Sequence, residues 1–392
     1  MPAAQTSIRA GVFLPQPTGY RAFIPQPLPP DDPPLEVDGE MQVLQERAAT
    51  ALGRLDAQAG HLPNPDRFVA AFVRKEAVLS SQIEGTQASL DDLLEYESAP
   101  ARVPAGDATD VVRYVAAMNH GLERLAGGFP LTLRLIREMH AVLLAEGRGS
   151  EKTPGEFRRS QNWIGDAGCT LNEARYVPPP PAEMHDALGN LERFLHTPDP
   201  VPLLIRCALA HAQFETIHPF LDGNGRTGRL LITFQLCHAG VLSRPLLYLS
   251  LFFKTHRAEY YRRLNDVRFA GDWEGWVKFF LRGVADVARR ATETAQAILA
   301  LRTEDDAAVR AAMPRSAANG LRALELAFDR PYLTARAVQE ETGFSQPTAK
   351  SLLDRLAEAG VLEDRPARSR GRVYVYERYL ALLREGTEPL PN

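Results

Sequence analysis

The sequence has few cysteines, little net charge and no long apolar run, and each of these absences excludes a class of protein. Among its 392 residues there are three cysteines, widely spaced and without a CxxC pair: Cys169, Cys207 and Cys237. This pattern is typical of a reducing compartment and argues against a disulfide framework or a structural zinc site. No stretch approaches the roughly 18 apolar residues of a membrane-spanning helix, and the N-terminus lacks the features of a secretory signal. We therefore expect a cytoplasmic protein with no membrane partner.

The charge balance excludes a chain built as a whole for nucleic acid. There are 45 basic and 49 acidic residues, which leaves a net charge of -4. Apolar residues make up 45% and charged residues 24%, as is usual for a globular protein. The length favours two or three domains.

Proline is abundant, and it is concentrated in two places. The segment 1–37 is rich in proline, which excludes helix and favours an extended conformation. We expect this segment to be either a tail or a strap across the main domain. The second place is Pro178–Pro181, directly after a polar turn that is flanked by Trp163-Ile164 and Tyr176-Val177. These flanks predict a β-hairpin with a rigid exit.

Most of the remaining sequence has helical periodicity, so the expected fold class is mainly all-α. An N-terminal helical region over 38–106 should hold helices at 40–55 and 64–83, the second starting at Asn64-Pro65 and ending near Gly85. Ser89–Asp92 has the pattern of a capping box that opens a further short helix. A helical core domain follows over 107–300, with predicted helices at 107–125, 132–146, 182–196, 201–216, 226–239, 255–268 and 272–300.

The C-terminal part, 314–380, has the element order of a winged helix. Three helices are predicted at 317–329, 334–342 and 346–359, followed by two short strands near 361–362 and 373–376. Thr334 should cap the second of these helices. Two functions remain open for this module. Arginines in the expected wing (Arg365, Arg368, Arg370 and Arg372) and polar residues at the start of the third helix favour DNA, whereas the small basic excess favours dimerisation or target docking.

The loop over 218–229 carries a set of side chains suited to phosphate chemistry. Gly223, Asn224 and Gly225 precede an apolar-periodic helix, so their backbone N–H groups can converge on an anion at the positive end of the helix dipole. Arg226 and Arg229 lie on one face of the first turn, in reach of several phosphoryl groups.

Two further residues complete this constellation. Asp222 adds a carboxylate beside the anion site, which suits a Mg²⁺ ion that takes its other ligands from phosphate. His218 is the nearby side chain whose ordinary pKa lies close to neutrality, so it can accept a hydroxyl proton. Each residue type alone is commonplace, but a base, a cation ligand, an anion nest and two arginines within twelve residues indicate an active site.

The loop sequence His-Pro-Phe-Leu-Asp-Gly-Asn-Gly-Arg-Thr-Gly-Arg resembles the Fic family signature HPFx(D/E)GNGRxxR at every fixed position. The resemblance extends through Glu76–Gln87, Gly155–Ile164, Tyr176–Pro181 and Leu247–Ser250, and so covers roughly residues 35–290. It implies a Fic helical core in which the hairpin around Trp163–Val177 is a flap that binds an extended target segment by strand addition.

The resemblance also implies an activity, namely transfer of AMP from ATP to a Ser, Thr or Tyr hydroxyl of a target protein. His218 would take the hydroxyl proton, and Asp222 would hold Mg²⁺ between the α- and β-phosphates. The nest with Asn224, Arg226 and the neighbouring Gly228 would line the phosphate site, and Arg229 would bind the γ-phosphate. Phe220 would anchor the loop by packing inward.

Ser80–Gly85 resembles the family's inhibitory pattern (S/T)xxxE(G/N). Ser80 and Glu84 are four residues apart at a helix end and therefore face the same way. If this helix packs beside the loop, Glu84 can pair with Arg229 in place of the γ-phosphate and act as a brake. The same glutamate is thought to position water for AMP removal in some relatives, and the sequence does not separate the two roles.

Other functions stay open at this point. The chain is alternatively a DNA-binding regulator with a nucleotide-sensing Fic domain, or a Fic enzyme that removes AMP or uses another donor, since relatives move phosphocholine, phosphate or UMP. A homodimer is open as well, because many relatives self-associate.

Overall fold

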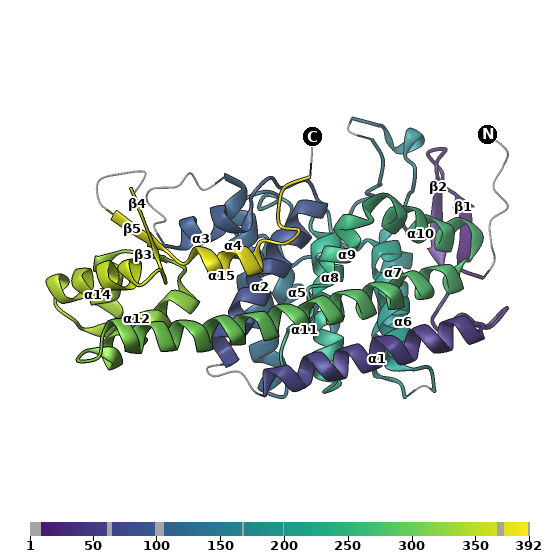
Figure 1. Cartoon of the computed structure of the whole chain (residues 1–392). Helices are drawn as coiled ribbons and strands as arrows, with labels where there is room; N and C mark the ends of the chain where they lie inside the picture. Colours follow the sequence, from purple (N-terminus) through teal and green to yellow (C-terminus); the bar gives the residue numbers. More distant parts are fainter. Residues whose placement is uncertain are drawn as a thin grey trace.

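The computed structural model describes residues 9–60, 65–98, 106–166, 168–198, 200–366 and 372–390. The helix start expected at Asn64 and the wing residues Arg368 and Arg370 lie outside these residues. The fold is mainly helical, as the periodicity predicted, with two small antiparallel sheets at opposite ends of the molecule (Figure 1). None of the described helices is long and apolar enough to cross a membrane.

The described part of the proline-rich segment forms a strap against the helical core. Strands β1 (Gly11–Pro15) and β2 (Arg21–Pro25) pair as an antiparallel ribbon, an arrangement that the proline spacing did not predict. The Phe23 N–H donates to the carbonyl of Val177 at 2.9 Å, and the Gln213 side chain donates to the carbonyl of Gln26 at 2.8 Å. The strap therefore contacts both the flap region and the helix that precedes the active loop.

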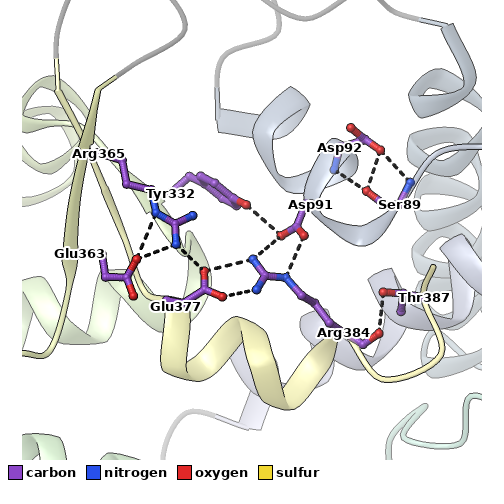
Figure 2. A network of polar contacts seen from close by, with 9 residues as sticks. All are labelled: Ser89, Asp91, Asp92, Tyr332, Glu363, Arg365, Glu377, Arg384 and Thr387. Atoms are coloured by element: carbon purple, nitrogen blue, oxygen red, sulfur yellow. Dashed lines mark hydrogen bonds and ion pairs between the residues drawn. The ribbon is translucent and has the colours of Figure 1, made fainter. Parts of the chain in front are cut away.

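The N-terminal helices are α1 (Gly39–Ala59), α2 (Pro65–Ile83) and α3 (Leu90–Ser98). The predicted capping box of α3 is present, because the Asp92 N–H donates to Ser89 Oγ at 3.2 Å and the Ser89 N–H donates to Asp92 Oδ2 at 2.9 Å (Figure 2). The predicted stop also holds, since α2 ends at Ile83 and Gly85 follows with a φ of 98°.

The core is a bundle whose central pair is α7 (Leu203–Ile217) and α8 (Asn224–His238). Almost every side chain of these two helices is buried, because other helices pack around them. These are α4 (Gly106–Ala126), α5 (Leu133–Leu143), α6 (Pro181–His196), α9 (Ser250–Thr255) and α10 (Arg257–Ala270). The short α9 was not predicted. The loop that joins α7 to α8 is the one in which the sequence places the chemistry.

Helix α11 (Trp273–Ala312) runs 40 residues and crosses from the core to the C-terminal module (Figure 1). The sequence predicted that it would end near residue 300, but it continues twelve residues further, because Leu301 and Val309 still have packing partners and are buried. Helix α1 lies beside it, and Lys278 on α11 contacts Asp38 at 2.5 Å.

The C-terminal module comprises α12 (Ala317–Asp329), α13 (Ala335–Thr342), α14 (Gln346–Glu358) and a three-stranded sheet. Its strands are β3 (Tyr332–Leu333), β4 (Glu363–Pro366) and β5 (Arg372–Val375), in the order β3-β5-β4. Helix α15 (Glu377–Leu383) then returns to pack against α11. Thr334 caps α13 as predicted, because its Oγ1 accepts from the Ala337 N–H at 3.1 Å. The element order is the one expected for a winged helix, although β3 and α15 were not predicted.

Candidate active site

The loop between α7 and α8 turns sharply at both ends. His218 directly follows α7 and has a left-handed backbone with a φ of 49°, and Gly223 directly precedes α8 with a φ of 73°. A left-handed residue is strained unless its surroundings hold it, and such residues cluster at functional sites. The first turn of α8 begins at Asn224, so its unpaired N–H groups face the concave side of the loop.

Two buried side chains fix the inside of the loop. Phe220 packs inward as predicted, and its ring stacks on His140 with 3.6 Å between ring centroids. The Asn224 side chain accepts from the Phe220 N–H and donates to the Phe220 carbonyl, both at 2.8 Å. The Asn224 amide therefore holds the loop closed on itself, and its contribution to an anion site comes from its backbone N–H.

His140 on α5 is part of the site, although the sequence analysis missed it. The Gly155 N–H donates to its Nδ1 at 2.8 Å, so Nδ1 carries no proton, and Nε2 then donates to the Asp222 carbonyl at 3.0 Å. Burial lowers the pKa of His140 to about 4, which keeps this neutral tautomer. His140 lies 82 residues before Asp222, and no spacing pattern connects the two.

Arg158 and Asn162 tie the base of the flap to the active loop. Arg158 is buried, and its guanidinium donates to the carbonyls of His218 at 3.0 Å and Pro179 at 2.5 Å. The Asn162 side chain donates to the carbonyls of His218 at 3.2 Å and Phe220 at 2.8 Å. These contacts hold the backbone of His218 in its left-handed conformation. Both residues fall in the quoted segment Gly155–Ile164, but only the fold shows what they contact.

The predicted flap is present in reduced form. A single antiparallel bridge joins Ile164 and Tyr176, with N–H to carbonyl distances of 2.8 and 3.1 Å in the two directions, rather than a regular two-stranded ladder. Helical turn η2 (Leu171–Glu173) lies in the excursion between them and is capped by Thr170 and Glu173. Trp163 is 42% exposed beside the bridge. The polar residues of the turn favour local capping over strand pairing.

His218 is neutral at physiological pH. Burial, together with the positive charges of Arg268 and Arg158, lowers the pKa of its imidazole to about 3. A neutral imidazole has one nitrogen with a free electron pair, which is what a proton acceptor requires.

Asp222 and Arg226 face each other at the start of α8. Their closest charged atoms are 3.6 Å apart, and Asp222 Oδ1 also accepts from the Gly223 N–H at 2.6 Å. The described residues contain no group of three or more His, Cys, Asp or Glu side chains arranged to hold a metal. One carboxylate beside an anion site fits Mg²⁺, which takes its remaining ligands from phosphate oxygens and water.

The pairing expected between Arg229 and Glu84 is present. The Arg229 guanidinium, which is buried, donates to Ser80 Oγ at 2.7 Å, to the Ser80 carbonyl at 3.0 Å and to Glu84 Oε1 at 2.8 Å. Removal from water alone raises the pKa of the Glu84 carboxyl, but the charge and hydrogen bond of Arg229 outweigh that effect and hold the pKa below its usual value. Glu84 is therefore ionised.

The Glu84 carboxylate also lies against the first turn of α8. A Cβ atom placed on Gly225 would overlap Glu84 Oε1, so only glycine admits the carboxylate at this position. An oxyanion from the chain itself thus lies at the helix start, the kind of position that attracts anions.

Two further buried carboxyls surround Arg229 and were not found from the sequence. Burial raises the pKa of both Glu76 and Glu215 to about 7. Glu76 accepts from the Ser250 N–H at 3.1 Å, from Ser250 Oγ at 2.5 Å and from the Tyr114 hydroxyl at 3.3 Å. These groups join α2, α4 and α9 behind the site.

Two family models match the part of the chain that holds this site. Residues 43–123 match the model described as Fic/DOC family N-terminal, and residues 130–236 match the model described as Fic/DOC family. The chain therefore contains both Fic/DOC domains, and the loop over 218–229 lies within the second match.

Curated relatives share the name protein adenylyltransferase Fic. The protein from Aedes aegypti is 34% identical over 165 residues, which cover 41% of this chain and 28% of the relative. The one from Drosophila willistoni is 30% identical over 262 residues, covering 64% of this chain and 48% of the relative. The alignments therefore span less than half the length of these relatives.

Among solved structures, a Fic family protein from Desulfovibrio desulfuricans G20 has the same fold. The comparison gives a TM-score of 0.56 at 21% identity and covers 87% of this chain and 97% of that one.

Proposed function

We propose that this protein transfers AMP from ATP to a hydroxyl side chain of a target protein. The observation that carries the proposal is the oxyanion at the start of α8, where Glu84 contacts Arg229 and lies against Gly225. A site that binds a carboxylate with a buried arginine and a helix N-terminus suits a phosphoryl group equally well.

The residues around this anion site supply the rest of the reaction. The target hydroxyl attacks the α-phosphorus of ATP, its proton passes to His218, and the bond to the β-phosphate breaks to release pyrophosphate. The triphosphate brings negative charge next to His218, and this raises the pKa of the imidazole from its low value and makes it a better base. Bound Mg²⁺ would be held by Asp222 and would neutralise phosphate charge.

The target enters as an extended segment. The bridge between Ile164 and Tyr176 leaves the flap with little internal strand pairing, so its backbone is suited to pair with a second strand. Exposed Trp163 offers an apolar contact beside it.

Glu84 acts as the brake on this reaction. Its carboxylate and a γ-phosphate compete for Arg229 and for the space above Gly225, so ATP cannot bind productively while Glu84 is in place. A released enzyme therefore requires the end of α2 to move.

The C-terminal module does not favour a DNA-binding function. Five of its basic side chains are paired with carboxylates of the same module, which leaves less positive charge for a phosphate backbone: Arg330, Arg336, Lys350, Arg365 and Arg372.

The test compares nucleotide labels in a released variant. Glu84→Gly incubated with Mg²⁺ and a host lysate should transfer label from α-labelled ATP and not from γ-labelled ATP, and mass spectrometry should locate AMP on a hydroxyl residue. The double variant Glu84→Gly, His218→Ala is the control and should transfer nothing. Transfer of the γ-label, or of UMP in preference to AMP, contradicts the proposal.

A further inference from the structure

We propose that residues 384–388, which follow α15 and are called here the C-terminal latch, hold the inhibitory end of α2 against the active loop. The C-terminal module would then govern the brake through this segment. The inference rests on the brake proposed for Glu84 and adds what controls it.

The latch contacts α2 between the two inhibitory residues. Gln82 lies between Ser80 and Glu84, and its side chain is buried. Its Nε2 donates to the carbonyls of Thr387 and Ala88, both at 2.8 Å. Both amide hydrogens are therefore used, and one of the two acceptors comes from a residue 305 positions away in the chain. Loss of the latch leaves a buried donor unpaired on α2, close to Glu84 in the chain.

The latch is itself held by the core. The Lys254 ammonium on α9 donates to the carbonyl of Gly386 at 2.7 Å and also to that of Glu388. Gly386 has a φ of 76°, and a Cβ atom there would overlap the side chain of Leu251. Thr387 is buried beside them. The latch therefore packs closely against Leu251 and Lys254 of α9, and this packing requires glycine at position 386.

A network of charged groups connects the latch to the C-terminal module (Figure 2). Arg384 donates to both carboxylate oxygens of Asp91 on α3, at 2.8 and 3.0 Å, and it also pairs with Glu377 on α15. The Tyr332 hydroxyl on β3 donates to the same Asp91 at 2.8 Å. Arg365 on β4 donates to Glu377 at 3.0 Å. Strand β3 is thus connected to Arg384 of the latch through Asp91, and strand β4 is connected to it through Glu377.

Two other contacts at the end of α2 come from the core. Arg257 donates to the Ile83 carbonyl at 3.1 Å, and Arg148 donates to the Glu84 carbonyl at 3.1 Å. These contacts fix the backbone after the helix regardless of the module. The Gln82–Thr387 contact is therefore the point at which a rearrangement of the module changes how firmly Glu84 is held.

The experiment weakens the contact from both sides in the full chain. Gln82→Met removes both donors from the helix side, and Gly386→Val displaces the latch from the other side without altering α2. Each variant should raise incorporation of AMP from α-labelled ATP by about fivefold or more, the range expected for coupled sites. The double variant should exceed neither single variant by much, because both break one contact. Gln87→Met, an exposed glutamine just beyond Gly85, is the matched control and should behave as wild type.

The outcomes separate the latch from the proposed activity. If Glu84→Gly is active but both latch variants stay at the wild-type level, or if their effects multiply, the latch is wrong and the activity stands. If Glu84→Gly is inactive, the activity fails, and hydrogen exchange then decides the latch. The peptide over 76–88 should exchange faster in both latch variants than in wild type and Gln87→Met, and unchanged exchange would falsify the latch.

Discussion

Glu84 and Arg229, 145 residues apart in the chain, meet at 2.8 Å directly over the start of the helix that carries the active loop. The arginine is almost fully buried, whereas about a third of the glutamate side chain is exposed. The partner that can leave is therefore the carboxylate, while the cation stays in place.

This asymmetry predicts how nucleotide binding responds to removal of the carboxylate. Glu84→Gly should bind ATP with Mg²⁺ at least about tenfold more tightly than wild type, since each ~1.4 kcal/mol of lost competition is worth a factor of ten. Isothermal titration calorimetry measures this directly. Glu156→Gly, at an exposed ion pair near the flap, is the control. Equal affinities for wild type and Glu84→Gly would contradict competition for Arg229.

Replacing the base should stop chemistry and spare binding. In the Glu84→Gly background, His218→Ala should lower the rate of AMP transfer by about 10²–10⁴-fold, the usual contribution of a general base. Its affinity for ATP should change little, because no phosphate contact is assigned to the imidazole. Single-turnover labelling gives the rate and calorimetry the affinity. A variant that loses both together would indicate that His218 supports the loop instead.

Replacing Arg158, which connects the flap to the active loop, should lower stability and activity more than replacing the adjacent Arg159. Arg158→Met leaves the Pro179 carbonyl without a donor, at a cost of ~1–3 kcal/mol, and leaves the His218 carbonyl with Asn162 as its side-chain donor. We expect a lower melting temperature. In the Glu84→Gly background we also expect AMP transfer to be about 10- to 100-fold slower, because His218 is no longer held in position. Arg159→Met changes the adjacent arginine, which is 89% exposed, and should leave both quantities unchanged.

The dependence of AMP transfer on Mg²⁺ should rest on the Asp222 carboxylate. Asp222→Asn keeps the shape of the side chain and its acceptor for the Gly223 N–H but removes the charge. Transfer by Glu84→Gly should require Mg²⁺ and cease with a chelator, and the added Asp222→Asn change should raise the Mg²⁺ concentration needed for half-maximal rate. Asp166→Asn, at an exposed flap residue, serves as the comparison. An unchanged Mg²⁺ requirement in Asp222→Asn excludes this carboxylate as the ligand.

The buried Glu76 predicts a pH dependence of stability. Its pKa is raised to about 7 from an ordinary value of 4.5, so the folded protein prefers the neutral carboxyl. This group stabilises the fold fully below pH 4.5, and the contribution is lost as the pH rises through 7. Glu76→Gln cannot ionise, and the Ser250 hydroxyl can rotate to accept from its amide.

Urea unfolding across this range tests the expectation. Between pH 5 and pH 7 the stability of wild type should fall by ~1–3 kcal/mol relative to Glu76→Gln, given 1.36 kcal/mol for each pKa unit. Parallel pH profiles for the two proteins would contradict a raised pKa.

The sequence predicted the elements of the active loop because they lie within twelve consecutive residues. His218, the glycines and both arginines form one local pattern whose chemistry depends on the start of a helix. The residues that start a helix can be recognised from the local sequence. The pairing of Glu84 with Arg229 was predicted as well, through the helical spacing of Ser80 and Glu84 together with the family pattern.

What the sequence did not predict depends on contacts between distant segments. His140 is held by Gly155 and Asp222, and its role follows only from the packing of α5 against the loop. Glu215 and Glu76 resemble ordinary helix residues until burial perturbs them. The short elements β3, α9 and α15 were missed because so few residues carry no periodicity, and tertiary contacts decide their conformation.

Helix α11 joins the helical core and the C-terminal module without a break. Its 40 residues form one rod of about 60 Å, and its last three turns belong to the C-terminal module while its first turns line the core. One continuous helix belongs to both parts, so we expect the two parts to move together. A chain ended at residue 300 would expose apolar side chains that α12 normally covers. Force or strain applied to the module would be transmitted along this rigid helix into the bundle that holds the loop over 218–229, so in a mechanical sense the protein behaves as one body.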